Sequence, residues 1–206
     1  MAGRVSTTGK LEMTIDSDKL MSIRRNLAKL RTEYVPGKDD SNPPSVKYLR
    51  SLQSAATDES HFVVLTTLLD SECRRFGLID ECDSLGRQMI GRFPEEPMPW
   101  IVFAAFLLHT KKNAEEARSV IETGVEKAIR RGKFIRHAYS TRARIARALQ
   151  DFDLLEDSLK RLLLHDPAIG AEDIALEGDF LINLPPGAIS DSVLERYRKL
   201  LERQHR

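Results

Sequence analysis

The feature that most constrains this chain is a regular succession of helix-length segments separated by short breaks. These segments are about 11–20 residues long, and their apolar residues follow helical spacing. No stretch alternates apolar and polar residues as a half-buried strand does. Short loops force consecutive helices to pack side by side, so the sequence predicts an all-α protein of antiparallel helical hairpins. The breaks fall at Gly77, Pro94–Pro99, Lys111–Asn113, Gly132, Gln150–Asp151, Pro167–Gly170 and Pro185–Gly187.

The organisation of the chain follows from its polar and apolar stretches. Residues 1–15 are polar and are predicted to form a flexible tail. Residues 16–35 are predicted to form an amphipathic helix, because their large apolar residues recur every three or four positions. Residues 36–44 form a polar linker, and 45–206 form the helical domain. The apolar stripe of the first helix consists of Leu20, Ile23, Leu27, Leu30 and Tyr34.

An internal repeat is visible in the segments that precede Pro94 and Pro167. Measured back from each proline, large apolar residues occupy the same positions in both segments, and each segment contains a turn at the same place. Two helices with this spacing and a closing proline form one helix–turn–helix unit. The aligned pairs are Ile79 with Phe152, Cys82 with Leu155, and Ile90 with Leu163.

This pattern resembles the tetratricopeptide (TPR) repeat family, whose unit is about 34 residues long. Residues 151–167 resemble the turn, second helix and terminal Asp-Pro of that unit. In a middle unit, Asn113 and Glu116 form a capping-box-like pair at the start of the second helix. The first helix of that unit carries the family-like residues Trp100, Phe103, Ala104 and Leu107.

The resemblance covers about residues 60–170 and has departures. The middle unit has an extra residue in its turn, its second helix runs on to Arg131-Gly132, and Asp70 occupies a position where the family has a small residue. The resemblance implies a short right-handed superhelix of stacked hairpins. Extra helices are expected at 16–35, near 171–184 and at 190–204.

The resemblance also implies a function, because proteins of this family act as scaffolds, adaptors or chaperone partners. Their first helices line a concave groove that binds a peptide or helix of another protein. An apolar floor flanked by arginines would fit a partner with apolar anchors and carboxylates. The groove positions of the family fall on Arg74, Ile101, Ala105, Leu108, His137, Ser140, Arg144 and Arg147.

The charge pattern adds a second candidate surface, although the net charge of the chain is only +1. The segment 127–150 holds eight basic and no acidic residues. It could contact an acidic protein, RNA or a phosphate-bearing ligand. Equally, its cations could form ordinary ion pairs with the acidic residues of 151–157 and 172–179. The basic residues are Lys127, Arg130, Arg131, Lys133, Arg136, Arg142, Arg144 and Arg147.

The sequence offers little catalytic chemistry. It contains no Gly-rich phosphate loop, Gly-x-Ser-x-Gly elbow or His-Glu-x-x-His motif. Cys73 and Cys82 lack ligand-spaced neighbours and are predicted to be free buried thiols. The scattered histidines are predicted to be satisfied locally. We therefore expect no enzyme activity, no metal and no cofactor. The histidines are His61, His109, His137, His165 and His205.

Compartment and self-association are the remaining expectations. The N-terminus lacks the apolar core of a secretory signal, and the apolar run 100–108 is shorter than the roughly 18–20 residues that span a bilayer. A cytoplasmic protein is therefore expected. The helix at 16–35 could dock on the protein's own body, occupy the groove as an internal ligand, or pair with its twin in a homodimer.

Overall fold

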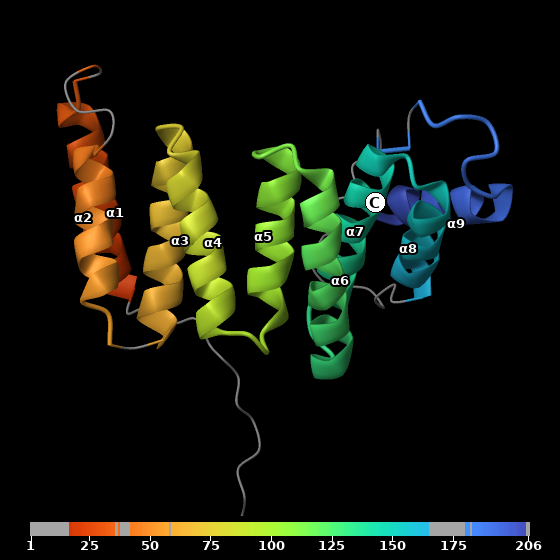
Figure 1. Ribbon diagram of the computed structural model, residues 1–206, viewed down its shortest axis with the longest axis horizontal. Helices are drawn as coiled ribbons and strands as arrows, with labels where there is room; N and C mark the ends of the chain where they lie inside the picture. The colour runs from red at the N-terminus through yellow and green to blue at the C-terminus, as the bar shows by residue number, and fades with distance from the viewer. Residues whose placement is uncertain are drawn as a thin grey trace, which may run out of the picture. The chain divides into compact units, whose positions relative to one another are not determined.

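All regular secondary structure in the described part of the protein is α-helical. The computed structural model describes residues 17–35, 37, 42–57, 59–164, 180–181 and 183–204. These residues form nine helices and no strand, which confirms the all-α prediction (Figure 1). The chain divides into two compact units, Met1–Leu85 and Gly86–Arg206, so that the boundary lies within one helix, α4 (Ile79–Arg92).

The first unit contains α1 (Ser17–Glu33), α2 (Pro44–Ser54), α3 (Glu59–Arg75) and the first half of α4. Pro44 starts α2 at a position where its missing N–H costs nothing. α2 packs against both α1 and α3. The core is made of apolar side chains with no exposed surface, namely Val46, Leu49, Leu69 and Cys73.

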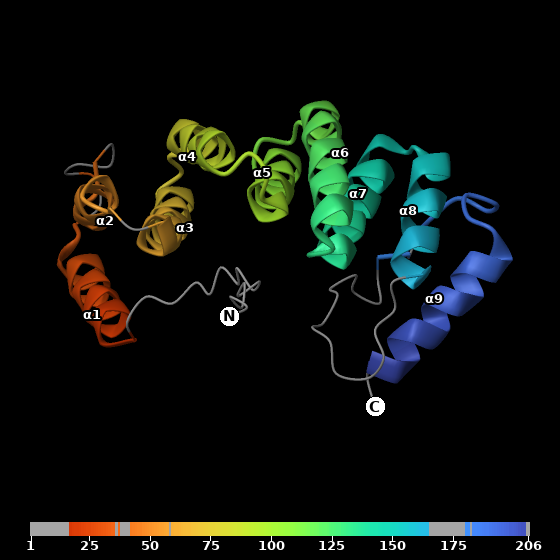
Figure 2. The same cartoon turned by 90° about the horizontal axis from the view of Figure 1, so that it is seen from below.

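The second unit contains the rest of α4 and five more helices. These are α5 (Pro97–His109), α6 (Ala114–Arg131), α7 (Ile135–Leu149), α8 (Phe152–Leu164) and α9 (Asp191–Gln204). α5 pairs with α6 and α7 pairs with α8 as helical hairpins (Figure 1). α6 also contacts α7, α5 contacts α7, and α9 packs against α8 (Figure 2).

The ends of α6 show why this helix has these limits. The backbone N–H of Glu116 donates to Asn113 Oδ1 at 3.1 Å, and Asn113 Nδ2 donates to Glu116 Oε2 at 3.0 Å. The predicted capping pair is thereby confirmed. The helix ends at Gly132, whose φ of 65° lies in the left-handed region that favours glycine.

α5 is apolar on nearly all sides, because it packs against both α6 and α7. Phe106 and Leu107 are buried, and the helix carries no acidic residue. Gly124 of α6 lets the two backbones approach closely, because a Cβ there would lie 3.2 Å from Trp100 Cβ and 3.5 Å from the backbone nitrogen of Ile101.

The C-terminal region departs in part from the expected helix near 171–184. Residues 171–179 lie outside the described residues, as do the tail 1–15 and Pro167–Gly170. Phe180, Leu181, Asn183 and Leu184 are not helical, and Asn183 has a φ of 65°. Such a conformation interrupts a helix, so no helix covers this end of the expected range. α9 lies within the expected range 190–204, and α1 lies within 16–35.

Candidate functional site

The face of α7 carries most of the predicted partner-binding residues. His137, Ser140, Arg144 and Arg147 are spaced by three, four and three positions, so they form one row along the helix. All of them are half-buried. At the start of the row, Ser140 Oγ donates to the His137 carbonyl at 3.2 Å, and the Phe134 ring meets the His137 ring at 6.0 Å between centroids.

The other end of this row contacts Phe180, the first residue of the stretch 180–181 and 183–204, which we call the C-terminal segment. Arg147 Nη1 donates a hydrogen bond to the Phe180 carbonyl oxygen. The Arg147 guanidinium carbon also lies 5.2 Å from the centroid of the Phe180 ring. Phe180 is only 8% exposed. One arginine of α7 therefore binds both the backbone and the ring of a residue that follows α8 in the sequence.

Further residues attach the C-terminal segment to the rest of the second unit. Tyr197 of α9 is buried, and burial raises the pKa of its hydroxyl while the nearby Arg144 charge opposes the rise. Ser190 Oγ donates to Glu156 Oε1 of α8 at 2.7 Å. Ile189 and Val193 are buried as well. The contacts thus combine apolar burial with polar contacts to α7 and α8.

The predicted floor residues of α5 divide into buried and accessible positions. Ile101 is 4% exposed and Leu108 is 8% exposed, so both contribute chiefly to internal packing. Ala105 is half-buried, and the neighbouring Val102 is 48% exposed. Val102 was not singled out from the sequence, because an all-round apolar helix has no periodicity that indicates its outer face. Among the residues of α5, Val102 alone is a large apolar side chain that is exposed.

Arg74 lies on α3 in the first unit, apart from the other predicted residues in the sequence. Its Nε donates to Asp70 Oδ2 at 2.7 Å, one helical turn earlier. Asp70 stands where the resemblance to the TPR family leads one to expect a small residue. Its carboxylate serves as the ion-pair partner of the predicted binding residue.

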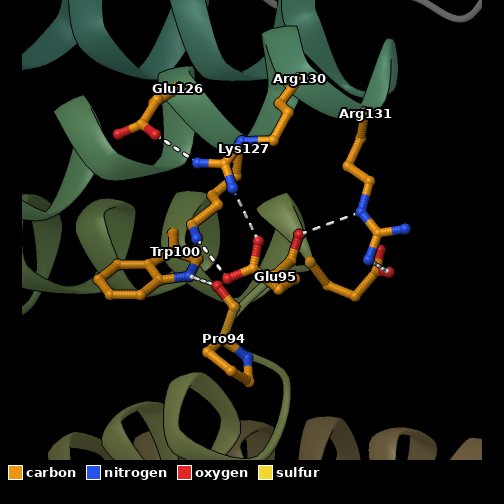
Figure 3. Close-up of polar contacts among 8 residues, drawn as sticks. Pro94, Glu95, Trp100, Glu126, Lys127, Arg130 and Arg131 are labelled. Atoms are coloured by element: carbon orange, nitrogen blue, oxygen red, sulfur yellow. Dashed lines mark hydrogen bonds and ion pairs between the residues drawn. The ribbon is translucent and has the colours of Figure 1, made fainter.

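The basic segment 127–150 is joined to acidic side chains that precede it. Glu95 accepts from Lys127 at 2.6 Å and pairs with Arg130 at 3.1 Å, and the hydrogen bond from Lys127 lowers the pKa of Glu95 (Figure 3). Arg131 pairs with Glu96 at 3.2 Å. The loop between α4 and α5 is thereby fixed to the end of α6. Trp100 Nε1 adds a hydrogen bond to the Pro94 carbonyl at 3.0 Å.

Arg142 of α7 bridges the helices on either side of it. Its Nε donates to Glu122 Oε1 of α6 at 2.8 Å, and its Nη1 donates to Asp157 Oδ2 of α8 at 2.6 Å. The side chain is 14% exposed. For Lys127, Arg130, Arg131 and Arg142 the interpretation as intramolecular ion pairs is confirmed. Most of their partners precede the basic segment, whereas the sequence predicts acids that follow it.

Both cysteines are buried free thiols, as predicted. A hydrogen bond with Cys73 and burial together raise the pKa of Cys82, so its thiol stays protonated at neutral pH. Cys82 Sγ also lies 3.8 Å from the Asp70 carbonyl oxygen. These are the surroundings of packing residues, since a reactive cysteine needs an accessible thiolate.

Metal-binding clusters and membrane-spanning helices are both absent from the described residues. Within those ranges, no three His, Cys, Asp or Glu side chains are grouped so as to hold a metal ion. Two of the histidines, His165 and His205, lie outside them. Over the same part of the chain, every helix is too short or too polar to cross a membrane.

The second unit is thus built of paired helical hairpins. One face of α7 contacts the C-terminal segment of the same unit. Comparison with protein families, curated proteins and solved structures gave no match to this chain.

Proposed function

We propose that this protein is a TPR-like helical-repeat interaction module that binds a peptide or helix of a partner protein along α5 and α7. The supporting observation is that α5 contacts α6 and also α7, while α7 contacts α8. The first helices of the two hairpins are therefore direct neighbours. Stacked hairpins use this arrangement to build a continuous binding face.

The chemistry of this face favours an amphipathic partner with carboxylates. α5 contributes the exposed Val102 and the half-buried Ala105, and α7 contributes His137, Ser140 and Arg144. An apolar strip beside cationic and hydroxyl groups suits apolar anchors flanked by acidic residues. Because the groups stand on packed helices, little ordering cost accompanies binding.

Nucleic acid or a phosphate ligand receives less support as an alternative. Lys127, Arg130 and Arg142 already bind carboxylates, so a phosphate would have to displace these partners. Tyr139, a candidate stacking group, is 5% exposed, and Phe134 is 39% exposed. Base stacking requires open aromatic faces, which Tyr139 does not offer.

Val102→Glu tests the proposal, with Ile129→Glu as the matched control. Both residues are exposed apolar side chains of the second unit, at 48% and 53%, but Ile129 lies on α6 outside the proposed face. We expect Val102→Glu to weaken partner binding by about tenfold or more, because it places a charge where an apolar anchor packs. Ile129→Glu should bind as wild type does.

The measurement is affinity capture from native extract, with and without nuclease treatment, analysed by mass spectrometry and followed by titration of the purified partner. Circular dichroism checks that both variants fold. Equal binding by wild type and Val102→Glu would contradict the proposed face. Capture that disappears on nuclease treatment would point instead to nucleic acid.

A further inference from the structure

We propose that Arg144 and Arg147 form a recognition subsite for a segment that bears an aromatic residue, and that the C-terminal segment is its resident occupant. A partner segment of the same chemistry would displace it. This proposal names a competitor for the partner at the face of α7, and it depends on the proposed function. The subsite itself rests on the contacts of Arg147 with Phe180 and on the burial of Tyr197 near Arg144.

Arg147 contacts Phe180 through groups that a separate peptide also carries, a backbone carbonyl and an aromatic ring. Its guanidinium donates to a backbone carbonyl and at the same time lies 5.2 Å from the Phe180 ring centroid. A carbonyl is common to every peptide, and the ring adds a preference for aromatic residues. The pair of contacts therefore recognises an aromatic residue through its ring and its own backbone carbonyl.

The position of these contacts links them to partner binding. Arg147 and Arg144 belong to the same row of α7 as His137 and Ser140, which the repeat resemblance marks as groove positions. Phe180 lies 33 residues beyond Arg147 in the sequence. The C-terminal segment is thus an element separate from the α7–α8 hairpin, and its helix α9 packs against α8 (Figure 2).

A tethered occupant is a strong competitor. A segment in the same chain acts at an effective concentration on the order of mM, whereas a partner arrives from solution. Ile189, Val193 and Tyr197 are buried and add apolar attachment. A partner must therefore bind the apolar residues Val102 and Ala105 of α5 as well as the subsite. The C-terminal segment would exclude ligands that bind more weakly.

The experiment uses a labelled synthetic peptide of residues 180–204 and the full-length chain. We expect the peptide to bind a Phe180→Ala chain at least about tenfold more tightly than wild type, because the weakened internal segment gives way. Binding should fall again in a Phe180→Ala/Arg147→Met chain. A peptide with alanine in place of Phe180 is the matched control and should bind poorly.

Equal binding of the peptide to wild type and Phe180→Ala, or binding to neither, would overturn the subsite. Hydrogen exchange of the α9 amides provides a second measurement that does not depend on the Phe180 variant folding. Arg147→Lys keeps the charge but loses the planar fork, and should speed that exchange, whereas unchanged exchange would count against the subsite. Loss of partner binding by Val102→Glu together with no peptide binding would remove this inference and keep the proposed function.

Discussion

At the scale of single residues, a glycine of α4 allows the Phe103 ring of α5 to approach closely. A Cβ added to Gly86 would lie 2.2 Å from Phe103 Cδ2, far inside contact distance. Gly91, on the same helix, has nothing within 4 Å of the corresponding point. Both glycines lie on α4, but only at Gly86 would an added side chain meet a neighbour. Gly91 is therefore the matched control for Gly86.

Gly86→Ala should destabilise the protein by about 1–3 kcal/mol, because the added methyl group overpacks against the Phe103 ring. Gly91→Ala should stabilise it by about 0.5–1 kcal/mol, because alanine loses less backbone entropy in a helix. Urea unfolding of both variants measures the difference. Phe103→Leu combined with Gly86→Ala should recover part of the loss. A Gly86→Ala variant as stable as Gly91→Ala would show that the Gly86–Phe103 contact is absent.

At the scale of elements, α1 uses its apolar stripe within its own unit. Ile23 and Leu27 are buried at 5% and 2% exposure. Tyr34, just after the helix, meets the Phe76 ring at 5.0 Å between centroids. Arg31 donates to Glu72 of α3, whose side chain is 2% exposed. Arg31 thus links α1 to α3, while α2 is the helix that packs against α1, and homodimer formation through α1 stays a prediction.

Leu27→Ala should release α1, whereas Met21→Ala should not. Truncating a buried leucine costs about 2–5 kcal/mol, because transfer and cavity terms add. Met21 is 54% exposed, so its truncation should change stability by less than about 0.5 kcal/mol. Hydrogen exchange across α1 and urea unfolding measure both effects. Unchanged protection of α1 in Leu27→Ala would contradict the attachment of α1 through its buried apolar stripe.

Features that depend on neighbouring positions of one helix could be predicted from the sequence, whereas contacts between distant segments could not. The stripe with Leu27 and the Asn113–Glu116 cap depend on neighbouring positions in one helix, and both are present. The attachment of Glu95 to Lys127 depends on where a loop meets a helix end, which no local pattern encodes. The contact of Arg147 with Phe180 is of the same kind.

At the scale of the whole molecule, four carboxyl groups in the two units share a lowered pKa. Burial raises the pKa of Glu72, but the hydrogen bonds from Arg31 and the nearby positive charge outweigh it. Hydrogen bonds from lysines lower the pKa of the other three. They are Glu95, Glu156 and Glu195, which receive these bonds from Lys127, Lys160 and Lys199 respectively.

The free energy of unfolding should therefore fall in acid. A carboxyl with a lowered folded pKa contributes stability that is present above its unfolded value of 4.5 and is lost as pH drops through the folded value. Urea unfolding between pH 7 and pH 3 measures the slope. Glu72→Gln should cost about 1–3 kcal/mol at pH 7 by removing a buried charge-assisted hydrogen bond, and its curve should approach wild type near pH 3. Glu195→Gln, at an exposed carboxyl, should leave the curve nearly unchanged. A constant gap between wild type and Glu72→Gln across this range would show that the ionised Glu72 does not hold α1, because only a contribution that titrates disappears with protonation.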